Sequence, residues 1–146
     1  MARSALVALA LVLACDKGGD SAPASAPAEV AKGPPLASMD FFRIDAKPVA
    51  PCAPGDTCMA ELVLTALGDY KVNDDYPFKF VGDPDGDCTV EGTGTFKKDS
   101  AKRGTMTVRF RPAKPGAALT GTFKLSVCTE EECEIESPAI TLPIGS

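Results

Sequence analysis

The chain has 146 residues, and its 20 acidic and 15 basic side chains give a net charge of −5, which argues against a nucleic acid or an anionic lipid surface as its main partner. It contains no histidine, and this excludes Ser-His-Asp and Cys-His catalytic arrangements as well as zinc sites built on imidazole. Acid–base chemistry near neutral pH would have to come from carboxylates or thiols with shifted pKa values.

The N-terminus carries the pattern of a secretory signal. One basic residue, Arg3, precedes an apolar run from Ala5 to Leu13, and the small Ala14 stands directly before Cys15. The ending "VLAC" resembles a bacterial lipobox, which would place a lipid on Cys15 as the first residue of the mature chain. The alternative is an ordinary signal peptide that happens to contain a cysteine. We therefore expect a lipid-anchored protein of the bacterial cell envelope, on the inner or the outer membrane and facing the periplasm.

The next segment, residues 15–35, is rich in Ala, Pro, Gly and Ser and holds almost nothing that could be buried. Such a segment cannot offset its ordering entropy, so we expect a flexible linker that holds a domain away from the membrane. With residues 1–14 as the signal peptide, residues 36–146 remain as one small domain. We expect this domain to be a monomer.

Alternation of apolar and polar residues predicts strands throughout that domain. Apolar side chains recur at every second position in 104–112 and again in 121–128, which is typical of strands with one buried face. Further strand candidates are residues 39–45, 59–67, 76–82, 89–96 and 139–144. Turns rich in Gly, Pro and Asp separate these segments, and no helical pattern is evident. About seven short strands of this kind predict an all-β fold, an antiparallel immunoglobulin-like β-sandwich.

The cysteines are interpreted for an oxidising compartment, where closely spaced pairs form disulfides. With Cys15 assigned to the lipid, five of the six cysteines remain. Cys52 and Cys58 bracket the turn "APGD", so we expect them to form a structural disulfide. Cys88 has no evident partner, and it is either a buried thiol or an exposed one that can form mixed disulfides.

The remaining pair lies in "SVCTEEECEIE", residues 126–136. One strand ends near Val127 and the next begins near Ile135, so Cys128 and Cys133 should face each other across a four-residue hairpin loop, within disulfide range. An exchanging dithiol, an inert staple and a metal clamp are all open interpretations. The five glutamates of this stretch should raise the thiol pKa and slow the reduced pair as a nucleophile. No complete tetrahedral ligand set is visible, so we expect no metal and no other cofactor.

An acidic stretch, "GDPDGDCTVEG", places Asp83, Asp85 and Asp87 at alternate positions, as at the start of a calcium loop. Cys88 and Gly94 stand where such a loop needs glycine and glutamate. An acidic turn between two strands explains this stretch better.

Two segments, "ALGDYKVNDDYPFKF" and "GTFKLSVCTEEECEIESPAITLPI", resemble the N-terminal periplasmic domain of the thiol:disulfide interchange protein DsbD, over about residues 40–144. The resemblance implies an immunoglobulin-like sandwich that passes electrons to a periplasmic protein partner, with Cys128 and Cys133 as the catalytic pair. Any electron supply would have to come from a separate protein, and the partner would be a thiol–disulfide oxidoreductase or another periplasmic protein. The alternative is a non-catalytic, disulfide-stapled β-sandwich lipoprotein that acts as a binding or structural module of the envelope.

Overall fold

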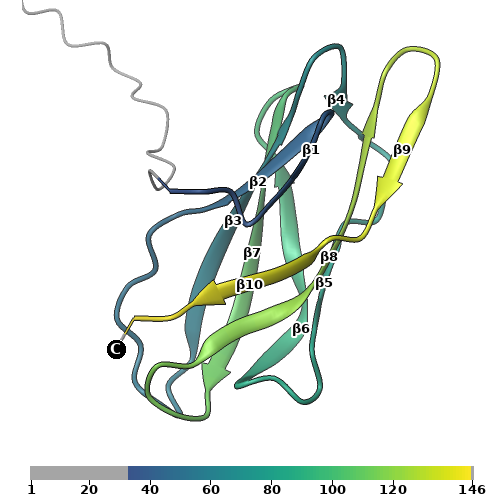
Figure 1. Cartoon of the computed structure of the whole chain (residues 1–146). Coiled ribbons are helices and arrows are strands. Elements are labelled where there is room, and N and C mark those ends of the chain that lie inside the picture. The colour runs from purple at the N-terminus through teal and green to yellow at the C-terminus, as the bar shows by residue number, and fades with distance from the viewer. Residues whose placement is uncertain (1–32, 146) are drawn as a thin grey trace, which may run out of the picture.

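The computed structural model describes residues 33–145, so the predicted signal peptide, Cys15 and most of the predicted linker lie outside the described residues. Within this range the chain forms ten strands and no helix, and so no helix that is long and apolar enough to cross a membrane (Figure 1). The strands are β1 (Ala37–Met39), β2 (Phe42–Ala46), β3 (Cys58–Ala66), β4 (Lys71–Val72), β5 (Lys79–Gly82), β6 (Cys88–Lys98), β7 (Arg103–Pro112), β8 (Ala118–Cys128), β9 (Cys133–Glu136) and β10 (Ala139–Pro143).

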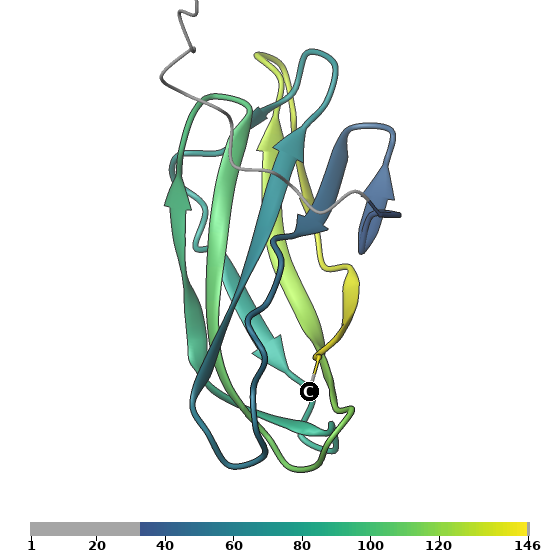
Figure 2. The same ribbon diagram turned by 90° about the vertical axis from the view of Figure 1, so that its left-hand side faces the viewer.

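The strands form two antiparallel sheets that pack as layers (Figure 2). The first sheet has the order β1-β2-β3-β7-β6. In the second sheet, β8 is central, and each of its edges is covered by two short strands. Thr122 of β8 pairs with β10 on one edge and with β5 on the other, whereas Cys128 pairs with β9 and with β4. The all-β antiparallel fold expected from the sequence is confirmed.

The core lies between the two sheets and is built from the alternating positions that the sequence indicates. Met106, Val108 and Phe110 of β7 are fully buried, and so are Phe123 and its alternate neighbours Leu125 and Val127 in β8. Because successive side chains of a strand point to opposite faces, the residues that alternate with these buried ones point away from the core. The even-numbered residues of β8, which include Cys128, therefore face away from the core.

Three of the predicted strands are divided or shortened in the structure. The predicted strand 39–45 is instead a hairpin of β1 and β2, whose register pairs Met39 with Phe42. The predicted strand 139–144 is found as β10, which begins at the expected residue and is one residue shorter. The predicted strand 76–82 is reduced to β5, because Phe78 leaves the sheet and stacks on Phe96 with ring centroids 3.8 Å apart. The three additional strands β1, β4 and β9 have at most four residues each.

A bulge in β6 shows why the pattern 89–96 is less regular than its neighbours. The register with β7 shifts between Glu91 and Thr95. Gly92 and Gly94 adopt φ angles of 72° and 75° there, a region that side chains with a Cβ rarely enter. These two glycines allow the long strand to bend around the core.

Candidate functional site

The candidate site is the disulfide between Cys128 and Cys133, at the tip of the β8–β9 hairpin. Cys128 is the last residue of β8 and Cys133 is the first residue of β9, and the two are directly paired with their Cα atoms 4.0 Å apart. The amide of Thr129 donates a hydrogen bond of 2.8 Å to the carbonyl of Glu132 just beyond them. The expected facing of these two cysteines across a short loop is therefore present.

The loop is held by the side chain of Thr129. Its hydroxyl accepts hydrogen bonds from the backbone amides of Glu131 and Glu132, each 3.2 Å long. This local side-chain-to-backbone pattern stabilises a tight turn without any help from the core. The turn and the β8–β9 pairing together bring the two cysteines into register.

The two cysteines of this disulfide differ in their exposure to solvent. Cys133 is exposed, because it opens the short strand β9 at the rim of the sheet. Cys128 is half-buried, since it ends the central strand and has a neighbouring strand on each side. The disulfide therefore joins an exposed cysteine to a half-buried one.

The glutamates of the hairpin do not form the ring around the disulfide that their spacing suggests. Glu134 and Glu136 pair with the buried Val127 and Leu125, so their side chains project to the opposite face from the sulfurs. Glu132 also lies on that face, where its carboxylate accepts a hydrogen bond of 3.4 Å from the hydroxyl of Tyr70. Of the five glutamates of the hairpin, Glu130 and Glu131 in the turn are therefore the ones left near the disulfide face.

The carboxylates on the face opposite the disulfide act on the hydroxyl of Tyr70. Burial against its surroundings raises the pKa of its hydroxyl, and the carboxylates of Glu132 and Glu134 raise the pKa further. Its ring lies 5.3 Å from the ring of Phe41. Tyr70 therefore acts as a packed support for the hairpin on the side away from the disulfide.

Lys71 is the residue that sequence reasoning missed. It is paired directly with Cys128 across β4 and β8, so the side chains of Lys71, Cys128 and Cys133 form a row on one face of the sheet. A strand of two residues has no periodicity that could reveal its register.

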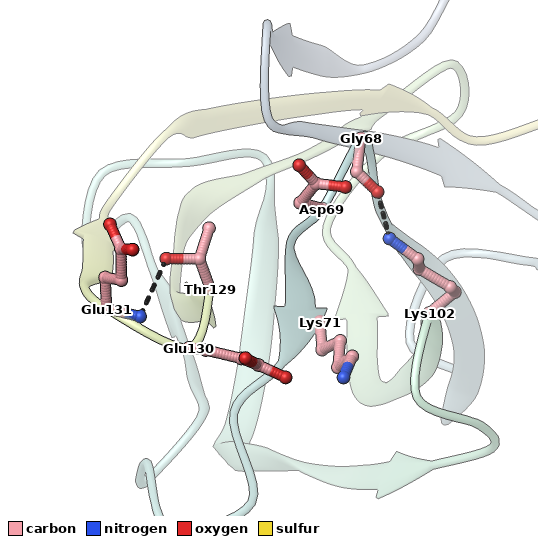
Figure 3. A pocket seen from close by; sticks show the side chains of 7 residues that line it. All are labelled: Gly68, Asp69, Lys71, Lys102, Thr129, Glu130 and Glu131. Carbon is pink, nitrogen blue, oxygen red and sulfur yellow. Dashed lines mark hydrogen bonds between the residues drawn. The ribbon is translucent and has the colours of Figure 1, made fainter.

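A pocket of about 590 Å³ opens beside this row, between the β3–β4, β6–β7 and β8–β9 turns (Figure 3). Its lining residues are Gly68, Asp69, Lys71, Lys102, Thr129, Glu130 and Glu131. The ammonium of Lys102 donates hydrogen bonds to the backbone carbonyls of Gly68 and Tyr70, which ties down the β3–β4 turn. Lys71 makes no ion pair with any residue of 33–145, so its ammonium is uncommitted within that range.

The second disulfide joins Cys52 to Cys58, with Cα atoms 6.2 Å apart. Only 7% of Cys52 is exposed, and it packs with the core. Cys58 begins β3, which runs nine residues toward the β3–β4 turn beside the candidate site. The two disulfides therefore lie at opposite ends of the sandwich and in different surroundings.

The other residues considered in the sequence, Cys88 and the three aspartates before it, lie in the core, in a turn and in an ion pair. Cys88 is a buried thiol, and burial, aided by the charge of Asp87, raises its pKa. Asp83 and Asp85 lie in the turn between β5 and β6, and Asp87 forms an ion pair of 2.8 Å with Lys114. Across residues 33–145, no three potential ligands gather as they would around a metal ion.

Comparisons with known proteins bear on the fold. No protein-family model matches the chain, and no curated protein matches it. Among solved structures it is similar to the GAE domain of yeast GGA1, with a TM-score of 0.50 and 15% sequence identity, covering 75% of this chain and 96% of that one. That domain is an immunoglobulin-like β-sandwich, and the domain described here has the same fold.

Proposed function

We propose that the protein is a membrane-tethered thiol–disulfide exchange module of the bacterial envelope, which passes electrons to a protein partner through Cys128 and Cys133. The observation that carries the proposal is the exposure of Cys133 within a hairpin disulfide at the end of the sandwich. Thiol–disulfide exchange needs a thiolate to reach one sulfur of the bond, so access selects which disulfide can react. The Cys52–Cys58 pair is less accessible on that criterion, because Cys52 is buried and Cys58 is half-buried, so neither cysteine is as exposed as Cys133.

Two features of the sequence support the same proposal. The lipobox-like ending at Cys15 and the linker after it would hold the domain at a membrane surface. The resemblance to the N-terminal domain of DsbD assigns electron transfer to the same two cysteines. The partner on this proposal is a periplasmic thiol–disulfide oxidoreductase.

The hairpin is suited to a redox cycle because no residue of β9 is buried. Opening the bond removes a cross-link around a very short loop, which contributes about 2 kcal/mol on the loop-entropy account. No core side chain needs to move when the bond opens. The domain can therefore remain folded in both oxidation states.

The test is a glutathione redox titration of the full chain, read by differential alkylation and mass spectrometry of each cysteine. We expect the Cys128–Cys133 bond to open first, with a potential of roughly −120 to −270 mV, and the Cys52–Cys58 bond to persist to below about −300 mV. If the two bonds resist reduction alike, the hairpin is a staple. The protein would then be a non-catalytic binding or structural module.

The tether is tested separately, through Cys15. We expect the wild-type protein to partition with membranes and the Cys15→Ser variant to be released or mislocalised. Intact-mass analysis of the native protein checks the modification directly. A mature N-terminus at another residue, without lipid, would contradict this part of the proposal.

A further inference from the structure

We infer that a partner's thiolate attacks the sulfur of Cys133, that Cys128 leaves as a thiolate, and that the ammonium of Lys71 stabilises the charge on Cys128. The inference rests on the proposed exchange function and adds an order of events to it. It draws on two independent observations, the unequal exposure of the two cysteines and the register of β4 against β8.

The first observation concerns which sulfur can be reached. A thiolate attacks along the axis of the S–S bond, from the side opposite to the leaving sulfur. Approach to Cys133 is open, because it lies in an exposed position on the outer strand β9. Approach to Cys128 would have to come over β4, which covers the other edge of β8.

The exchange proceeds through two successive displacements at sulfur. A thiolate of a partner protein dithiol forms a bond to Cys133, and the Cys128–Cys133 bond breaks with its electron pair going to Cys128. The partner's second thiol, after losing its proton to water, attacks the partner sulfur of the mixed disulfide and releases Cys133 as a thiolate. The partner ends as a disulfide and the hairpin ends as a dithiol, reduced by two electrons. A disulfide on the next protein reverses the sequence.

The second observation places a cation beside the leaving sulfur. Directly paired residues of antiparallel strands have Cβ atoms about 4.5–5.5 Å apart, and Lys71 and Cys128 form such a pair. The flexible stem of lysine lets its ammonium follow a charge that forms nearby. Lys71 has no ion-pair partner among residues 33–145, whereas Lys102 is occupied by backbone carbonyls.

Other charged groups act on the same thiolate. Asp69, Glu130 and Glu131 line the pocket that Lys71 also lines, and their carboxylates oppose a thiolate (Figure 3). The hairpin carboxylates of Glu132 and Glu134 lie on the far face of the sheet, on the side of Tyr70. Lys71 is thus the cation on the disulfide face that is paired directly with Cys128 and favours its charged form.

The first experiment needs no substitution. Oxidised wild-type protein is exposed briefly to reduced glutathione and quenched with acid, and the mixed disulfide is located by mass spectrometry. A protease that cuts after glutamate separates Cys128 from Cys133, because three glutamates lie between them. We expect glutathione on Cys133. Glutathione predominantly on Cys128 would overturn the proposed order.

The second experiment measures the effect of the cation. In full-length Cys133→Ser protein, the rate at which iodoacetamide alkylates Cys128 is followed against pH. We expect Lys71→Met to slow alkylation at neutral pH about threefold, the value for one charge about 6 Å away in a water-like medium. Lys71→Arg should retain the wild-type rate, and the effect of Lys71→Met should fade at about 1 M salt because the pair is exposed. A merely structural role would show neither response.

Lys124→Met is the matched control. Lys124 is exposed on the same strand and the same face as Cys128, but four residues away, about 13 Å, beyond the screening length at about 0.1 M salt. If Lys71→Met and Lys124→Met alkylate alike, Lys71 has no role in the exchange. In the wild-type cysteine background, Lys71→Met should also shift the glutathione equilibrium toward the disulfide. If glutathione opens the hairpin bond in no variant, the exchange function itself falls.

Discussion

Gly121→Ala tests the packing of β5 and β10 on β8, the central strand of the second sheet that ends at Cys128. Gly121 pairs with Gly82 of β5 and with Ile140 of β10, and a Cβ at this position would lie 2.5 Å from the carbonyl oxygen of Val81 and 2.7 Å from the ring of Phe80. Carbon atoms normally approach no closer than about 3.5 Å. The methyl group therefore requires a shift of about 1 Å in a buried ring and in a paired backbone.

Overpacking of this kind costs about 1–3 kcal/mol, a large share of the 5–15 kcal/mol that stabilises a typical domain. With a urea dependence of about 1–3 kcal/mol per M, the midpoint of unfolding should fall by about 1 M. Urea unfolding followed by circular dichroism measures this shift. Gly145→Ala is the control, since a Cβ there meets nothing within 4 Å. A Gly121→Ala variant as stable as the wild type would refute the packing of β5 and β10 on β8.

Three further predictions concern ionisable groups. The hydrogen bond from Lys114 lowers the pKa of Asp87, so this pair stabilises the fold above the ordinary pKa of aspartate, and the gain is lost as pH falls through the lowered pKa. The urea midpoints of wild type and Lys114→Met should differ at about pH 7 and converge once the pH is below the lowered pKa of Asp87. Cys88, buried and with a raised pKa, should resist alkylation in the native state and become reactive only at the unfolding midpoint, and stoichiometric labelling of folded protein would contradict its burial. Glu132→Gln should lower the pKa of Tyr70, followed by the NMR shift of its ring carbon, and an unchanged titration would show that the carboxylate does not act on it.

The sequence predicts the long strands well because their burial is one-sided. In β7 and β8 the apolar positions of the alternating pattern are the fully buried residues, such as Met106 and Phe123. The cysteine pairing of the hairpin is predictable for the same reason, since a strand that ends near Val127 leaves a loop of fixed length. Local pattern and turn chemistry suffice for these features.

What the sequence could not predict depends on register between distant segments. The strand β4 has two residues, so nothing in "KV" indicates that Lys71 pairs with Cys128. The spacing of the glutamates suggests a continuous acidic ring, but the strand alternation sends Glu134 and Glu136 to the other face. The two-residue turn within residues 39–45 is not evident from the sequence, because apolar residues stand on both sides of it, at Met39 and Phe42.

The position of the hairpin would separate its proposed redox chemistry from the stability of the fold. Val127 is the last fully buried residue of β8, and the disulfide lies one residue beyond it, where β9 contributes no core side chain. The bond at Cys52, by contrast, packs against the core at the other end of the sandwich. On the proposed function, reduction of the first bond should leave the hydrophobic core intact, whereas reduction of the second should loosen the packing around a buried residue. The difference in exposure between these two short-loop disulfides is thus the reason for proposing that one serves exchange and the other serves structure.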